Sequence, residues 1–143
     1  MQEKIIVLDD NEDFLIIFEA IFKDVFDIST ASTIRELVRK LEKQKFDLII
    51  VDHTMPRIEG LELIKILHRA IPEMAIILCS GTRNQRVIRE AFECCATGFV
   101  SKENLTYNKK NELAERIFKI IEKHRTREVL TGNINLLKPL KDL

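Results

Sequence analysis

Short apolar segments alternate with longer amphipathic segments along most of the chain. Three of the short segments, Lys4–Asp9, Phe46–Asp52 and Ala75–Ser80, are almost continuously apolar and rich in β-branched residues. Runs of this kind are typical of parallel strands that are covered on both faces. Two weaker segments, Phe26–Ala31 and Gly98–Ser101, are candidates for two further strands.

The segments between these strands repeat apolar residues every three or four positions, which predicts amphipathic helices. Thr33 and Glu36 form a capping-box pattern at the start of the second helix. The fifth helix is expected to run to about residue 124. The first helix is expected to bury one apolar face, which consists of Phe14, Ile17, Phe18, Ile21 and Phe22.

Five strand–helix units in succession predict an α/β fold. Right-handed crossovers place such a chain in a doubly wound parallel five-stranded sheet with helices on both faces. The expected strand order is the flavodoxin-like 2-1-3-4-5. Residues 1–125 would form this domain, and residues 126–143 a C-terminal tail or the start of a linker. The apolar residues of the tail lack a regular period, so two alternatives remain equal: a packed or frayed tail, and a partner-binding extension or the start of a linker.

Composition adds a few limits. The 143 residues suit one domain, and 23 basic residues balance 23 acidic ones, so charge favours no nucleic-acid partner. No leader and no membrane-spanning run is evident, so a cytoplasmic protein is expected. Cys79, Cys94 and Cys95 lack the spacing of a disulfide framework and fit reduced thiols.

Polar residues end four of the expected strands, at one edge of the sheet. Ligands of doubly wound folds bind at this edge. Asp9, Asp10 and Asp52 would gather there, and neighbouring carboxylates repel one another unless a cation relieves the repulsion. Mg²⁺ prefers such oxygen ligands and commonly bridges them to phosphate. Ser80 could hydrogen-bond a phosphoryl oxygen, and the charge of Lys102 suits a phosphoryl group.

These residues, taken in order, resemble the signature of a receiver domain of two-component response regulators. The resemblance spans roughly residues 4–125. None of these motifs is specific by itself, but their order at the ends of four strands is specific for this family. The residues that carry it are Asp9-Asp10, Asp52 with Met55, Pro56 and Gly60, Ser80-Gly81, Phe99 and Lys102.

The resemblance implies a role for each matching residue. Asp52 would accept a phosphoryl group from a histidine kinase or a histidine phosphotransfer protein. Asp9, Asp10, Asp52 and the backbone carbonyl of Thr54 would bind Mg²⁺. Lys102 and Ser80 would contact the phosphoryl group, and Ser80 and Phe99 would switch on activation.

The same resemblance implies a readout surface made of the fourth helix, the fifth strand and the fifth helix. This surface would control an unknown downstream protein or form a homodimer. No DNA-reading segment and no membrane partner is expected. Such a domain takes part in its own phosphorylation and dephosphorylation and is not a conventional turnover enzyme.

One position departs from the family pattern. The family usually has a proline after the lysine, with a cis bond before it, whereas Glu103 follows Lys102 here. A cis bond without proline costs about 2.5–4 kcal/mol, so a trans bond could place Lys102 differently. This departure favours the alternative of a pseudo-receiver that binds proteins without phosphorylation. A Mg²⁺-dependent phosphatase ranks last, because Thr54 stands where its second acid would be.

Two further expectations concern the first helix and the three histidines. Leu15 and Ile16 lie off the expected core face of the first helix, beside the acidic residues, and are candidates for docking the phosphodonor. His68 and His124 are expected on helix surfaces, and His53 in an exposed loop.

Overall fold

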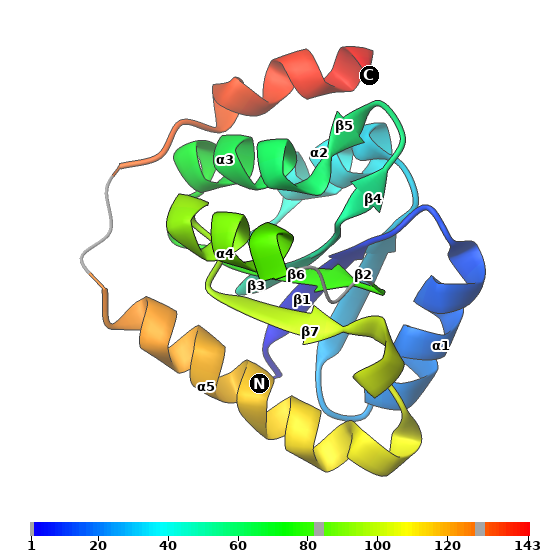
Figure 1. Cartoon of the computed structure of the whole chain (residues 1–143). Helices are drawn as coiled ribbons and strands as arrows, with labels where there is room; N and C mark the ends of the chain where they lie inside the picture. Colours follow the sequence, from blue (N-terminus) through cyan, green and yellow to red (C-terminus); the bar gives the residue numbers. More distant parts are fainter. Residues whose placement is uncertain (1, 82–84, 128–130) are drawn as a thin grey trace.

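The computed structural model describes residues 2–81, 85–127 and 131–143. Five parallel strands form one sheet in the order β2-β1-β3-β6-β7, which confirms the expected fold and strand order (Figure 1). The strands are β1 (Lys4–Leu8), β2 (Asp27–Ala31), β3 (Leu48–Asp52), β6 (Ala75–Ser80) and β7 (Gly98–Ser101). The α-helices are α1 (Glu12–Phe22), α2 (Ile34–Lys43), α3 (Gly60–Ala70), α4 (Gln85–Cys94) and α5 (Lys110–Arg125).

Helices cover both faces of the sheet. One core cluster joins the sheet to α2, α3 and α4, and the other joins it to α1 and α5. Successive residues of β1 alternate between the two clusters: Ile6 and Leu8 belong to the first, and Ile5 and Val7 to the second. This alternation explains why the central strands are apolar without interruption.

The first helix buries a different face from the expected one. Leu15 is only 6% exposed and packs in the α1–α5 core, so its expected place on the surface is wrong. Ile17, which was expected in the core, is 56% exposed, and Ile16 is 65% exposed. The exposed apolar pair of α1 is therefore Ile16 and Ile17.

A short hairpin separates β3 from α3. It pairs β4 (Thr54–Met55) with β5 (Ile58–Glu59) and was not expected from the sequence. Its turn contains Pro56 and Arg57, and Arg57 has a φ of 74°, the sign that the second central residue of a type II turn requires. The Met-Pro pair therefore serves a tight turn that leads the chain into α3.

Two short 3₁₀ turns, η1 (Lys102–Asn104) and η2 (Tyr107–Lys109), connect β7 to α5. The C-terminal tail ends in a longer 3₁₀ segment, η3 (Ile134–Asp142), which lies along α2 and α3 (Figure 1). Leu137 is fully buried there and Leu140 is 3% exposed. The tail is thus packed on the domain through these two leucines, while a role in binding a partner or in starting a linker stays a prediction.

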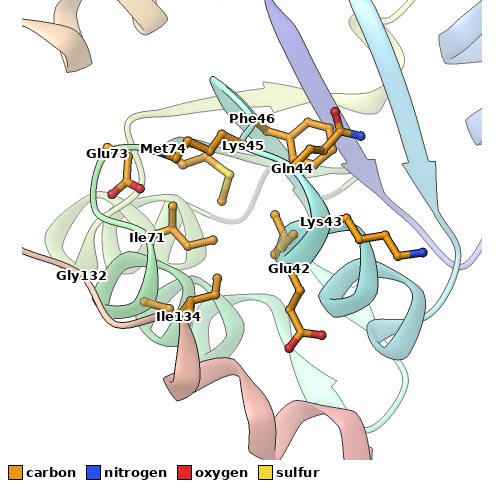
Figure 2. A pocket seen from close by; sticks show the side chains of 12 residues that line it. Glu42, Lys43, Gln44, Lys45, Phe46, Ile71, Glu73, Met74, Gly132 and Ile134 are labelled. Carbon is orange, nitrogen blue, oxygen red and sulfur yellow. The ribbon is translucent and has the colours of Figure 1, made fainter.

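The tail also closes one side of a cavity of about 460 Å³ at the amino ends of the strands. Figure 2 shows Ile71, Met74 and Ile134 around this cavity, with Glu42 at its rim. Lys141 of the tail pairs with Glu42 at 2.8 Å. The tail is therefore held by apolar burial and by an ion pair.

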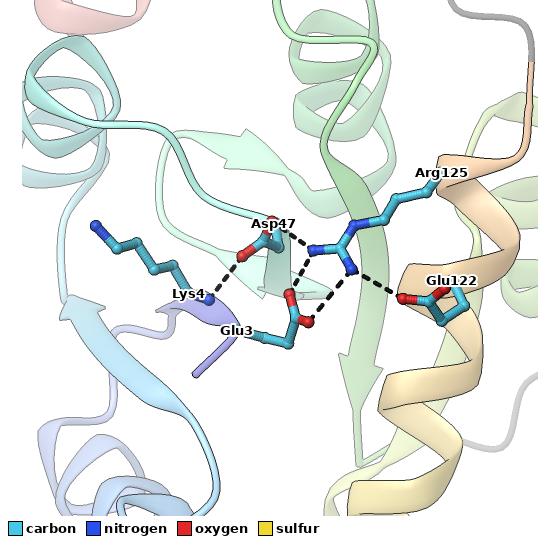
Figure 3. A network of polar contacts seen from close by, with 5 residues as sticks. All are labelled: Glu3, Lys4, Asp47, Glu122 and Arg125. Carbon is cyan, nitrogen blue, oxygen red and sulfur yellow. Dashed lines mark hydrogen bonds and ion pairs between the residues drawn. The ribbon is translucent and has the colours of Figure 1, made fainter. Parts of the chain in front are cut away.

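An arginine ties the end of α5 to the amino edge of the sheet. The Arg125 guanidinium contacts the carboxylates of Glu3, Asp47 and Glu122, with Asp47 at 2.9 Å (Figure 3). Asp47 also accepts a hydrogen bond from the backbone N–H of Lys4 at 2.8 Å. These contacts fix α5 against β1 and β3.

His124 is buried, contrary to the expectation of a surface position. It is 5% exposed, and its Nε2 lies 2.8 Å from the carbonyl oxygen of Pro72. This contact joins α5 to the loop before β6. No helix in the described part of the chain combines the length and the apolar character needed to cross a membrane.

Candidate functional site: an acidic pocket at the carboxyl edge of the sheet

The carboxyl ends of the strands bring three acids together. Asp9 follows β1 directly, and Asp52 is the last residue of β3, the strand beside it. The carboxylates of Asp9, Asp10 and Asp52 each offer an oxygen, and these oxygens lie within 4.8 Å of one another. The expectation that the three acids meet at one edge is confirmed.

The acids differ in their surroundings. Asp9 is 1% exposed and Asp52 is 5% exposed, whereas Asp10 faces solvent. Asp9 accepts a hydrogen bond from the backbone N–H of Asn11 at 2.9 Å, and Asn11 also caps α1. The carboxylate of Asp9 is therefore held in place by the loop that starts the first helix.

Lys102 reaches this pocket from the end of β7. Its Nζ lies 2.7 Å from Asp9 Oδ2 and 3.4 Å from Asp52 Oδ1. The same ammonium lies 4.7 Å from the centre of the Phe14 ring, a cation–π contact. The described peptide bonds include no cis bond, so Lys102–Glu103 is trans. The lysine reaches the acids without the cis bond that the family usually has.

The carboxylate of Glu103, the residue that replaces the proline of the family pattern, is held by a local hydrogen bond. Glu103 is exposed, and its carboxylate accepts a hydrogen bond from the Ser101 hydroxyl at 3.2 Å. Both residues lie beside Lys102, at the start of η1. Where the family pattern has a proline, this chain therefore has a glutamate that is hydrogen-bonded to Ser101.

The electrostatics of the pocket follow from burial and charge. Burial and the charge of Asp9 raise the pKa of Asp52, while Lys102 and the backbone N–H of Thr54 act against this increase. Partial burial acts to lower the pKa of Lys102, but Asp9 and Asp52 outweigh it and the pKa is raised. Lys102 therefore stays charged, and Asp52 is a carboxylate that water stabilises poorly.

Gly60 allows the loop after Asp52 to close tightly. A Cβ atom at this position would lie 2.9 Å from the backbone oxygen of Asp52 and 2.9 Å from the Cα of His53. Real Cβ atoms essentially never come this close to backbone. Gly60 starts α3, and the absence of a side chain lets α3 pack directly against the strand end that carries Asp52.

The donor set fits a hard divalent cation. Three carboxylates carry three negative charges within a small space, and Lys102 supplies one positive charge. Oxygen ligands and excess negative charge are what Mg²⁺ sites provide. The side chains of Asp9, Asp10 and Asp52 are the ones that could hold such an ion.

The other expected site residues lie on β4, β6 and β7. Ser80 ends β6 and is buried, at 4% exposure, while Thr54 is exposed in β4. Phe99 is half-buried in β7, and its carbonyl oxygen accepts a hydrogen bond from Arg116 of α5 at 2.6 Å. Residues 82–84, which follow Ser80-Gly81 in the sequence, lie outside the described residues.

Sequence reasoning missed two neighbours of the pocket. Phe14 was assigned to the core alone, yet its ring contacts Lys102. Cys79 was expected only to be a reduced thiol, yet it lies beside Asp52 in the pairing of β3 with β6, and burial raises its pKa to about 12. An aromatic residue one turn after an Asp-Asp pair was the only available signal for Phe14.

Comparison with known proteins gives a consistent result. A family model described as the response regulator receiver domain matches residues 5–130. The chemotaxis protein CheY of Thermotoga maritima is 29% identical over 104 residues, which cover 71% of this chain and 87% of that protein. PhoP of Bacillus subtilis, an alkaline phosphatase synthesis transcriptional regulatory protein, is 34% identical over 70 residues, covering 48% of this chain and 29% of PhoP.

A solved structure agrees in fold. A CheY-like response regulator receiver domain protein from Methanospirillum hungatei JF-1 superposes with a TM-score of 0.75 and 22% identity. The match covers 87% of this chain and 97% of that one. The η3 segment begins at residue 134, after the end of the family match at residue 130.

Proposed function

The chain belongs to the response regulator receiver domain family, and on this premise we propose that Asp52 accepts a phosphoryl group in two-component signalling. The donor would be a phosphohistidine of a histidine kinase or of a histidine phosphotransfer protein. Mg²⁺ would bind to Asp9, Asp10, Asp52 and the carbonyl oxygen of Thr54. A cytoplasmic location belongs to the same proposal.

The observation that carries the proposal is the position of Lys102 between two buried acids. Its ammonium lies 2.7 Å from Asp9 and 3.4 Å from Asp52, despite the missing proline. A phosphoryl group on Asp52 would bring negative oxygens next to this ammonium. The contact argues against a pseudo-receiver in which the lysine had been displaced.

The chemistry requires little covalent machinery from the protein. A carboxylate oxygen of Asp52 bonds to phosphorus while the bond from phosphorus to the donor nitrogen breaks, and that electron pair stays on the imidazole. Because Asp52 is poorly solvated, its carboxylate is a better nucleophile than an exposed one. Bound Mg²⁺ would neutralise phosphoryl charge, and Lys102 and Ser80 would contact phosphoryl oxygens.

Phosphorylation would then act on the surface formed by α4, β7 and α5. The proposed switch residues are Ser80, which ends β6, and Phe99, which lies within β7. The hydrogen bond from Arg116 to the Phe99 carbonyl links β7 to α5, so a movement of Phe99 would reach α5 directly. This surface would bind a downstream protein or a second copy of the chain.

The donor would dock beside the acidic pocket, on α1. Ile16 and Ile17 are exposed apolar residues there, and Ile17 lines a hollow of about 250 Å³ together with Phe14 and Lys102. Leu15 takes no part, because it is buried. Ile16→Lys and Ile17→Lys should slow transfer from the cognate donor while leaving phosphorylation by acetyl phosphate unchanged.

Beryllofluoride binding tests the proposal without a donor protein. With Mg²⁺ present, fluorine-19 spectra of the wild-type protein should show a bound adduct that is absent in Asp52→Ala. Chelation of Mg²⁺ should remove it. A wild-type protein that forms no adduct, although it is folded, would support the pseudo-receiver alternative and overturn the proposal.

A further inference from the structure

Two neighbouring cysteines lie at the end of α4 and are not among the residues of the acidic pocket. Cys94 is the last residue of α4, and Cys95 follows in the turn that leads to β7. Their sulfur atoms are 2.7 Å apart, about 0.7 Å more than the length of a disulfide bond. The two thiols are therefore already close to bonding distance.

The spacing favours a bond between the sulfurs over chelation of a metal. Two thiolates on one tetrahedral Zn²⁺ ion, each at about 2.3 Å, would stand about 3.8 Å apart. In the described residues, the only cluster of three or more potential metal ligands is that of Asp9, Asp10 and Asp52. Cys94 and Cys95 thus lack the additional ligands that a structural metal requires.

Both thiols are accessible from solvent, and they differ in their surroundings. Cys94 and Cys95 are half-buried, and Cys94 lines a surface hollow of about 350 Å³ beside Lys65 and Glu90. Burial and the hydrogen bond with Cys94 raise the pKa of Cys95 to about 12. Cys94 lines the hollow and Cys95 does not, so a peroxide that enters from solvent meets Cys94 first; this makes Cys94 the attacking residue and Cys95 the resolving one.

We propose that Cys94 and Cys95 are a modification site, at which hydrogen peroxide converts the two thiols to a reversible disulfide. The Cys94 thiolate attacks one peroxide oxygen, which gives a sulfenic acid and releases hydroxide or water. The Cys95 sulfur then bonds to Cys94 and displaces water. The two thiols lose two electrons and two protons, and the peroxide is reduced to two molecules of water.

The bond would be easy to reverse. Adjacent Cα atoms are about 3.8 Å apart, below the usual range of about 4.4–6.8 Å for disulfides. A disulfide outside this range has a higher reduction potential and belongs to the labile class. Ordinary cellular thiols would therefore reduce it, as a regulatory modification requires.

Closing the bond would loosen the end of α4. The backbone N–H groups of Cys95 and Ala96 both donate to the carbonyl oxygen of Ala91, at 3.1 and 2.9 Å. The Cys95 sulfur also donates to the carbonyl oxygen of Ile64 in α3, at 3.5 Å. Forming the bond removes the Cys95 S–H, so its hydrogen bond to Ile64 would be lost, and the strain of linking adjacent residues would weaken the backbone hydrogen bonds to Ala91. The effect falls on α4 and does not depend on Asp52.

Intact-mass spectrometry of the full chain tests the site. After mild treatment with hydrogen peroxide, the wild-type mass should fall by two hydrogens, and digestion should give a linked Cys94–Cys95 peptide. Dithiothreitol should restore the mass. Cys94→Ser and Cys95→Ser should show no such loss, whereas Asp52→Ala should behave as the wild type does. Amide exchange at Cys95 and Ala96 should become several-fold faster on oxidation.

Cys79 is an internal control, because it is 2% exposed. It should be alkylated only after unfolding, both before and after oxidation. The proposal is overturned if Cys94 and Cys95 both remain alkylatable after peroxide, if oxidation stops at a sulfinic acid, or if the product is a disulfide between two chains. These outcomes leave the proposed phosphoryl transfer untouched, since that reaction is tested on Asp52 alone.

Discussion

Lys102 lies closer to Asp9 than to Asp52, with its ammonium 2.7 Å from the first carboxylate and 3.4 Å from the second. The lysine is thus anchored by a buried acid that the proposed phosphoryl transfer does not consume. A group added to Asp52 would meet a cation that is already in position. The contact also explains how Lys102 stays in the pocket on a trans backbone.

The first prediction concerns the charge of Lys102. Because its charge lowers the pKa of Asp52, Lys102→Gln should raise that pKa further. The carbon-13 chemical shift of the Asp52 carboxyl, followed against pH without Mg²⁺, measures the change. Lys110→Gln is the matched control, since Lys110 pairs with Asp24 and not with the acidic pocket. An unchanged or lowered pKa in Lys102→Gln would contradict the account.

The second prediction concerns the dependence of stability on pH. The pKa of Asp52 is raised above its ordinary value of 3.8, so the folded protein binds this proton more tightly than the unfolded chain does. Ionised Asp52 therefore destabilises the fold above the raised pKa, and the penalty disappears as pH falls toward 3.8. Asp52→Asn should gain free energy of unfolding relative to the wild type as pH rises.

Urea denaturation of both proteins between acid and neutral pH, with chelator present, measures this difference. A difference that stays constant over the whole range would show that Asp52 titrates as an exposed carboxyl does, and one that grows toward acid would show that folding lowers its pKa; either result contradicts the account. Addition of Mg²⁺ at neutral pH should reduce the advantage of Asp52→Asn, because the ion stabilises the ionised wild-type pocket.

The third prediction concerns Gly60. A Cβ atom here would meet the backbone of Asp52 and His53 at 2.9 Å, so Gly60→Ala should cost about 1–3 kcal/mol of unfolding free energy. Gly81→Ala is the control, since among the described residues other than its chain neighbours no atom lies within 4 Å of a Cβ atom at that position. Chemical denaturation compares them, and equal stability of the two variants would refute the close packing of α3 on the strand end.

The fourth prediction concerns the tail. Leu137 is fully buried against α2 and α3, so Leu137→Ala should cost about 2–5 kcal/mol of unfolding free energy. Leu136 is its neighbour and is 42% exposed, so Leu136→Ala should change stability by less than about 0.5 kcal/mol. If both variants were as stable as the wild type, η3 would not be a packed part of the domain.

The sheet and the acidic pocket could be predicted from the sequence, because both depend on strong local signals. A strand buried on both faces must be apolar throughout, and the acids that end β1 and β3 then lie at one edge by topology alone. Asp9, Asp52 and Lys102 were found in this way, although they are far apart in the chain.

Other features lacked a decisive signal. Residues 14–18 of α1 are all apolar, so the period of the helix could not distinguish Leu15 from Ile17 as the buried residue. His124 is a single polar residue on the core face of α5, and only its partner, the carbonyl of Pro72, accounts for its burial. The tail follows a 3₁₀ path, which has no 3.6-residue period to detect.

The location of the phosphoryl group tests the central claim most directly. The wild-type protein is incubated with Mg²⁺ and acetyl phosphate, and the aspartyl phosphate is trapped by borohydride reduction and mapped by peptide mass spectrometry. The account predicts a single modified residue, Asp52, and no modification of folded Asp52→Ala or after removal of Mg²⁺. Modification at another residue, or a folded wild-type protein that takes up no phosphoryl group, would contradict it.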